Sequence, residues 1–192
     1  FLVGVIAGAF TQTDRIGFIG GMDIPLIHRF EAGYVAGARY ANPRVSTTVA
    51  YAGSTPQAFA DPAKGKELAL LQYDRGVDVI YHASGSTGNG VIEAARETDN
   101  YAIGVDSNQN YMAPGHVLTS MVKRVDNAVY MIVKSVVEDA FEGGVREFGL
   151  AEEGVGYAVD QHNEDLLPED VIALAEKARE EIIAGEIDVP RE

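Results

Sequence analysis

Apolar runs rich in β-branched residues alternate with stretches of helical periodicity along the chain, and this alternation restricts the possible folds more than any other feature. The apolar runs predict strands at residues 15–20, 44–53, 77–83, 101–106 and 117–122. Helical stretches separate the first four runs, and parallel neighbours need such crossovers. We therefore expect an α/β fold, in which an open parallel sheet is covered by helices on both faces.

The expected helices begin and end at residues that favour helix termini. They span residues 24–42, 62–76, 89–100, about 124–142, and 168–185. Asp61 is the expected N-cap of the second helix, with Pro62 at its first position and Gly76 at its C-terminal end. Pro168 and Gly185 mark the start and the end of the last helix in the same way.

The charge balance excludes one class of partner. The 192 residues contain 15 Lys and Arg against 29 Asp and Glu, a formal net charge of −14. Such a surface repels the phosphates of nucleic acids, so no nucleic-acid partner is expected. An excess of carboxylates is typical of proteins adapted to high salt, and an ordinary acidic protein is the alternative.

The sequence also excludes thiol chemistry and a membrane-spanning segment. There is no cysteine, so disulfides and thiolate metal sites are ruled out. No apolar run approaches the ~20 residues that a membrane helix needs. The chain begins with Phe1 rather than Met, and the simplest interpretation is a piece of a longer protein.

Polar or glycine-rich residues follow four of the predicted strands. They occupy positions 20–23, 53–57, 84–90 and 106–110. In open parallel sheets, ligands bind at the carboxyl ends of the strands, where loops converge with helix N-termini. The four strand ends therefore predict one ligand-binding crevice.

Asp106 and Lys123 are the strongest candidates for ligand contacts. An ionised carboxylate at the end of a buried strand can accept hydrogen bonds from adjacent hydroxyls of a sugar. Lys123 follows the next strand and could donate to a ribose oxygen or a phosphate. The alternatives are a turn residue for Asp106 and a solvated lysine at a helix start for Lys123.

The glycine-rich loop at 84–90 is a weaker candidate. Its glycines follow the pattern G-x-x-G-x-G, which is neither the dinucleotide fingerprint nor a P-loop. Glycines such as Gly85 allow the backbone to approach any ligand, and Ser84 or Ser86 could donate a hydrogen bond. A phosphate site is therefore less favoured than a general backbone contact.

Met22, Ile24 and Pro25 form an apolar shelf directly after the first strand. A flat heterocycle could rest on such a shelf. More often, such residues pack under the following helix.

No catalytic constellation is present in the sequence. The four histidines, His28, His82, His116 and His162, are scattered and show no metal-binding spacing. Only His82, at a strand end, is expected near the crevice, and a half-buried histidine bonded to the backbone is its favoured interpretation. We therefore expect no enzyme activity, no cofactor and no metal site.

Several motifs together resemble one protein family. They are "FIGGMDIP", "DPAKGKELA", "GVDS" and "LTSMVKRVD", and the likeness runs through essentially all 192 residues in order. The chain resembles the basic membrane protein family of solute-binding lipoproteins, which are purine-nucleoside receptors that serve ATP-driven importers. The resemblance implies one lobe of a type I periplasmic-binding-protein fold, in which two α/β lobes close on a nucleoside.

The resemblance also implies roles for individual residues. The acid of "GVDS" and the lysine of "SMVKR" hold the ribose in this family, so Asp106 and Lys123 are expected to do so here. The loop at 22–25 would contribute to the wall against which the base stacks, and the backbone near Gly85 would face the cleft. Asn108 stands where many relatives carry a second acid, so either this position is not essential or a neighbouring contact differs.

Four segments follow from the same comparison. Residues 1–13 are expected to end a missing N-terminal lobe, 14–123 to form the C-terminal lobe, 124–144 to return as a helix to the missing lobe, and 145–192 to form a hinge-side segment with the final helix. Without that lobe, an apolar stripe would be uncovered at Val125, Val129, Ile132, Val133 and Val136. Uncovered stripes predict self-association, unless the other lobe is a separate chain.

The function implied is that of a non-catalytic receptor for a nucleoside. Its partners would be the permease of an ABC transporter and the missing lobe, or a second copy of the chain. It would work outside the cytoplasm, lipid-anchored to the outer face of the cytoplasmic membrane. The alternatives are a ligand-sensing domain of a regulator and an α/β enzyme that processes sugars or nucleotides.

Overall fold

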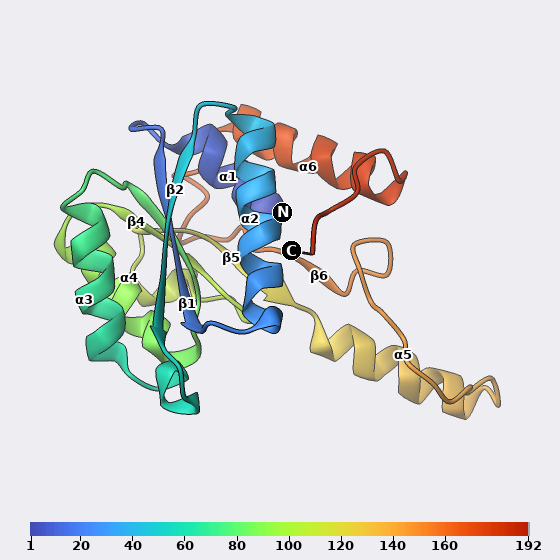
Figure 1. Cartoon of the computed structure of the whole chain (residues 1–192). Coiled ribbons are helices and arrows are strands. Elements are labelled where there is room, and N and C mark those ends of the chain that lie inside the picture. The colour runs from blue at the N-terminus through green and yellow to red at the C-terminus, as the bar shows by residue number, and fades with distance from the viewer. Residues whose placement is uncertain (192) are drawn as a thin grey trace.

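The computed structural model describes residues 1–191 and shows one six-stranded sheet flanked by helices (Figure 1). The strand order is β2-β1-β3-β4-β5-β6. Strands β1 to β5 are parallel, and β6 pairs antiparallel with β5. The strands are β1 (Arg15–Met22), β2 (Ser46–Gly53), β3 (Val79–Ala83), β4 (Tyr101–Gly104), β5 (Val117–Lys123) and β6 (Val155–Tyr157).

The helices confirm the expected α/β architecture. They are α1 (Leu2–Phe10), α2 (Pro25–Ala41), α3 (Pro62–Tyr73), α4 (Gly88–Glu97), α5 (Val125–Val137) and α6 (Glu169–Ile183). All five strands predicted from the sequence form, with ends within two residues of the expected ones. Among the described residues, no helix is both long and apolar enough to cross a bilayer.

Successive residues along the central strands point to opposite faces of the sheet and pack into two separate hydrophobic cores. Phe18 and Val79 point to one face of the sheet, where α1, α2 and α6 supply the apolar side chains. Ile19 and Ile80 point to the other face, which α3 and α4 cover. Because both faces of the sheet are buried, the sequences of the central strands are continuous apolar runs.

The expected helix termini are present. The Asp61 carboxylate accepts a hydrogen bond of 3.0 Å from the backbone N–H of Lys64, which makes Asp61 the N-cap of α3. Gly76 follows α3 with a φ of +85°, and Gly185 follows α6 with a φ of +77°. Both glycines take the left-handed conformation that ends helices.

Helix α1 packs within this lobe, whereas residues 1–13 were expected to end a missing N-terminal lobe. Seven of its nine residues, Leu2 through Gly8, are buried. The helix packs against α2 and α6 on one face of the sheet (Figure 1). Its approach to α2 is close, because a Cβ atom at Gly4 would collide with the Tyr34 carbonyl and one at Gly8 with the Ala38 carbonyl.

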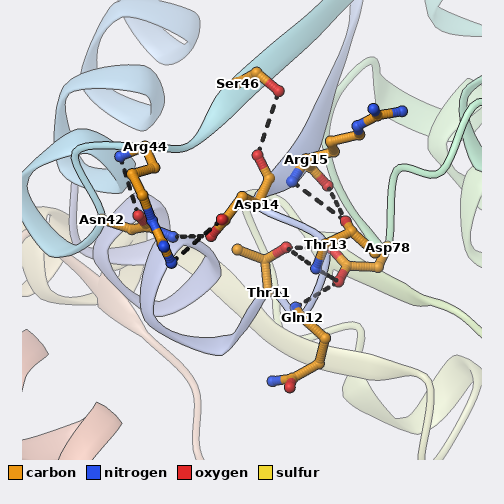
Figure 2. Close-up of polar contacts among 9 residues, drawn as sticks. All are labelled: Thr11, Gln12, Thr13, Asp14, Arg15, Asn42, Arg44, Ser46 and Asp78. Carbon is orange, nitrogen blue, oxygen red and sulfur yellow. Dashed lines mark hydrogen bonds and ion pairs between the residues drawn. The ribbon is translucent and has the colours of Figure 1, made fainter.

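The turn between α1 and β1 is fastened to the start of β3 by Asp78 (Figure 2). One oxygen of this carboxylate accepts a hydrogen bond of 2.6 Å from the Thr11 hydroxyl. The other accepts from the backbone N–H groups of Gln12 and Thr13, at 2.7 and 3.1 Å. The carboxylate thus satisfies donors just after the helix end and ties the N-terminal segment to the sheet.

Helix α5 projects away from the rest of the chain (Figure 1). None of its residues is buried. On the expected apolar stripe Ile132 is half-buried, whereas Val125, Val129, Val133 and Val136 are 55–60% exposed. That this helix returns to another lobe remains a prediction.

The last segment of the chain contributes to the same lobe. β6 extends the sheet beside β5, and α6 lies on the α1 face. Val171, Ala175 and Ala178 are the buried residues of α6, spaced to form one face of the helix. The final helix therefore completes the core that α1 and α2 begin.

Candidate functional site

The parallel strands bring their carboxyl ends to one edge of the sheet. β1 ends at Met22, β3 at Ala83, β4 at Gly104 and β5 at Lys123. The three loops after β1, β3 and β4 and the start of α5 meet there, in the lower part of Figure 1. The sequence-predicted residues lie in these loops and strand ends.

Asp106 and Lys123 meet at this edge. The Asp106 carboxylate and the Lys123 ammonium form an ion pair of 2.8 Å. The Lys123 backbone N–H also donates to the Asp106 carbonyl at 2.9 Å, which continues the β4–β5 pairing by one step. Asp106 has a φ of +65°, a left-handed conformation that is uncommon for residues other than glycine.

The pair remains open to solvent. The Asp106 side chain is 57% exposed and the Lys123 side chain 45%. The Lys123 ammonium lies 5.3 Å from the centre of the Phe30 ring on α2, within the range of a cation–π contact. A carboxylate acceptor and an ammonium donor therefore stand side by side, an arrangement suited to adjacent hydroxyl groups.

In the loop after β3, the backbone at Gly85 is exposed, whereas the first serine of the loop, Ser84, is buried. Gly85 is exposed with a φ of +59°, and Ser86 donates to the Phe59 carbonyl at 3.1 Å. Ser84 is completely buried, with its hydroxyl 3.5 Å from His82 Nδ1. Ser84 therefore does not reach the surface where a ligand contact was expected.

The apolar shelf after β1, formed by Met22, Ile24 and Pro25, is partly buried against the rest of the lobe. Met22 and Ile24 are half-buried, and Pro25 is exposed at the first position of α2. Ile24 packs against the core on the α2 face. The structure thus supports the packing interpretation for Ile24 and leaves Met22 and Pro25 beside the strand end.

His82 lies inside the lobe. Its ring is buried, and burial lowers its pKa to about 4, although Gln109 and Asp106 favour the charged form. At neutral pH the imidazole is therefore uncharged. Its Nε2 atom lies 3.0 Å from the Gln109 side-chain oxygen.

Sequence reasoning missed two residues around the site. Phe30 sits one turn and a half into α2, and nothing in the sequence indicates that its ring lies beneath the Lys123 ammonium. Gln109 was read only as part of a polar loop, whereas its side chain turns inward to His82 and to the Val105 N–H. Both contacts are tertiary, so periodicity carries no signal for them.

Metal binding has no support in the part of the chain that the structure describes. No group of three His, Asp or Glu side chains there is arranged to hold an ion. Two surface grooves, of about 660 and 1020 Å³, flank α2 and the start of α1, and neither includes Asp106 or Lys123. The exposure of both side chains shows that the ion pair stands on an open edge of the lobe.

Comparison with known proteins gives a consistent assignment. The family described as ABC transporter substrate-binding protein PnrA-like matches residues 1–192. The CD4+ T-cell-stimulating antigen of Listeria monocytogenes is 38% identical over 209 residues, which cover 99% of this chain and 56% of that protein. The ABC transporter nucleoside-binding protein BmpA of Lactococcus lactis is 36% identical over 208 residues, which cover 99% of this chain and 57% of that protein.

The solved structures agree. A crystal structure of an ABC transporter solute-binding protein from Aeropyrum pernix matches with a TM-score of 0.82 and 30% identity, over 100% of this chain and 64% of that one. The chain spans little more than half the length of the curated relatives, 56% and 57% of the two above. On sequence and on fold, the chain belongs to the PnrA-like family of ABC transporter substrate-binding proteins.

Proposed function

We propose that this chain forms one lobe of a receptor that captures a nucleoside, with a purine nucleoside as the preferred ligand, for an ATP-driven importer. The observation that carries the proposal is the Asp106–Lys123 pair at the carboxyl ends of β4 and β5. A relative named as a nucleoside-binding protein is 36% identical over nearly the whole chain. That name supports a nucleoside as the ligand class.

The chemistry of the pair fits a ribose. Two neighbouring hydroxyls can donate to the two oxygens of one carboxylate, and an ammonium can donate to a hydroxyl oxygen beside them. Asp106 and Lys123 offer both kinds of group within 2.8 Å of each other. The ion pair also holds Lys123 in place, so part of the ordering cost of binding is met before the ligand arrives.

A second lobe is needed to enclose the ligand. The pair is about half exposed, and an open site of this kind buries too little ligand surface for tight binding. In the proposed receptor, the remaining part of the longer protein would cover the ligand from the other side. Closure would give affinities on the order of 8 to 11 kcal/mol, in the sub-micromolar range.

The family supports the proposed partner and location. A substrate-binding protein of an ABC transporter delivers its ligand to a permease, so a permease is the expected partner. Relatives are named basic membrane proteins, and we infer an extracytoplasmic, lipid-anchored receptor. Capture without turnover agrees with a family of substrate-binding components.

The test is calorimetric titration of the full-length protein with inosine, guanosine, adenosine, uridine and free ribose. We expect the purine nucleosides to bind at sub-micromolar concentrations and free ribose to bind far more weakly. The Asp106→Ala variant should lose about 2 to 4 kcal/mol of purine-nucleoside binding, because it removes a charged hydrogen-bond acceptor and frees Lys123.

The matched control is Glu97→Ala, since Glu97 is an exposed acid at the end of α4, just before the start of β4, that pairs with Lys66 at 2.7 Å. It should leave nucleoside affinity within about threefold of the parent. Absence of nucleoside binding by the parent protein would refute the nucleoside assignment. Near-normal affinity of Asp106→Ala would refute the role of Asp106 alone.

A further inference from the structure

The turn that carries Asp106 is held from inside the lobe by one side chain. The Gln109 side-chain oxygen accepts a hydrogen bond of 2.8 Å from the Val105 backbone N–H, directly before Asp106. The same oxygen lies 3.0 Å from His82 Nε2. Gln109 thus closes the loop from residue 105 to 109 and fastens it to β3.

The contact defines which nitrogen of His82 carries the proton. The Val105 N–H must meet an acceptor, so the atom facing it is the Gln109 oxygen rather than the amide nitrogen. This oxygen can only accept, so His82 donates through Nε2–H and its Nδ1 faces the Ser84 hydroxyl at 3.5 Å. Burial holds the pKa of His82 at about 4, which keeps this neutral form at physiological pH.

The main chain of Gln109 is tied to the next strand. Its N–H donates to the Ser120 hydroxyl on β5 at 3.0 Å, and that hydroxyl donates to the Asn110 side chain at 2.8 Å. The space is tight, because a Cβ atom at Gly104 would lie 2.6 Å from the Ser120 hydroxyl and 2.8 Å from the Gln109 oxygen. The turn is therefore fixed to β3 through His82 and to β5 through Ser120.

The hydrogen bonds that hold this turn stabilise an unfavourable backbone conformation at Asp106. Asp106 has a φ of +65°, and a non-glycine residue keeps such a conformation only when its surroundings impose it. Asp106 itself is exposed, so its own side chain supplies little of that constraint. The hydrogen bonds on either side of it, at Val105 and Gln109, supply it together with the bond from the Lys123 N–H to its own carbonyl.

We propose that His82 and Gln109 are positioning residues for sugar recognition, because together they fix the turn that sets the Asp106 carboxylate beside Lys123. This inference rests on the proposed function. It adds a buried residue, His82, and a half-buried one, Gln109, that do not touch the ligand but determine how well a ribose is distinguished from a sugar without the 2′- and 3′-hydroxyls. Loss of either contact lets Asp106 leave the left-handed conformation, and the carboxylate then no longer holds a fixed direction.

The binding test compares two ligands in the full-length protein, inosine and 2′,3′-dideoxyinosine, which lacks the 2′- and 3′-hydroxyls of the ribose. The measured quantity is the ratio of their dissociation constants. His82→Leu and Gln109→Met should each lower this ratio at least about tenfold, equivalent to about 1.4 kcal/mol of lost discrimination. His82→Gln should restore the ratio, since its amide offers an N–H close to the position of Nε2.

Two controls separate positioning from general destabilisation. Tyr73→Phe removes a partly buried hydrogen bond of 2.9 Å to the Tyr101 carbonyl, at the opposite end of β4, and should leave the ratio unchanged. In the Asp106→Ala background, Gln109→Met should cause no further change. If His82→Leu and Gln109→Met lower stability but keep the parent ratio, the two residues are structural only, and the proposal is refuted.

A measurement without ligand keeps the proposal independent of the nucleoside assignment. In amide hydrogen exchange of the ligand-free protein, His82→Leu should accelerate exchange at Val105 and Lys123 at least about tenfold, while Phe18 in β1 stays protected. If the parent protein binds none of the nucleosides, the proposed function is wrong, and this exchange result still decides whether His82 holds the turn. Unchanged exchange at Val105 would overturn the positioning role.

Discussion

The buried imidazole of His82 makes the stability of this lobe depend on pH. Burial lowers its pKa from 6.5 to about 4. Unfolding exposes the ring, and its pKa returns to the value of a free histidine. Between pH 6.5 and 4 the unfolded chain therefore binds a proton that the folded chain does not.

The sign and the size follow from this difference. Because the folded pKa is the lower one, the stabilisation is complete above pH 6.5, and it is lost as the pH falls towards 4. With 1.36 kcal/mol for each pKa unit, the loss from this one group is about 3 kcal/mol. Asp160, whose pKa is lowered by its hydrogen bond to Asn108, acts in a lower range, below its ordinary value of 3.8.

The assay is urea unfolding at pH 7, 5 and 4, for the parent protein and for His82→Gln. Glutamine does not titrate, so the difference between the two proteins isolates the histidine. The parent should lose about 3 kcal/mol more than the variant between pH 7 and 4. An NMR titration of the imidazole gives the pKa directly, and a value near 6.5 or parallel pH profiles would refute the reasoning.

Three further predictions follow from the packing. Asp78→Ala should lower the free energy of unfolding by about 2 kcal/mol, measured by urea denaturation, because the carboxylate accepts three hydrogen bonds; no change would mean that water replaces it. Gly4→Ala should lower the free energy of unfolding by about 1 to 3 kcal/mol, measured by thermal denaturation, because the added methyl group would push α1 away from α2. Gly143→Ala is the control and should have little effect, because an added Cβ atom would meet no atom within 4 Å. Equal effects of the two substitutions would refute the close packing of α1 on α2. Val129→Asp should reduce self-association of the 192-residue chain in sedimentation velocity, and unchanged association would exclude the α5 stripe as the contact.

The sheet was predictable because its strands are buried on both faces. Continuous apolar runs such as residues 77–83 are typical of strands in such a sheet. The ends of α3 were predictable as well, because Asp61 and Gly76 determine them through contacts and backbone conformations within a few residues. β6 was missed, since it has three residues and depends on pairing with β5. Such pairing leaves no periodicity in the sequence.

The placement of α1 shows a different limit. Its apolar residues predict burial, but an apolar helix does not reveal which surface covers it. The resemblance to a two-lobe family favoured the missing lobe, and the structure places the helix against α2 instead. Gly4 and Gly8 at helical spacing were an available signal for close helix packing.

The candidate site was predictable where strand ends determine it. Asp106 lies just after β4 and Lys123 ends the adjacent parallel strand β5, so their proximity follows from the sheet order. Ser84 was expected to donate to a ligand from the glycine-rich loop, but it is buried and its hydroxyl turns inward to His82. The inward direction depends on the buried ring of His82, and the contacts of Gln109 depend on it equally.

The most direct test of the account is a crystal structure of the full-length protein with a bound purine nucleoside. The account predicts ribose hydroxyls within about 3 Å of the Asp106 carboxylate and the Lys123 ammonium. It also predicts that the Gln109 side chain still accepts from Val105 and His82. A nucleoside bound away from the carboxyl ends of β4 and β5 would contradict the central claim.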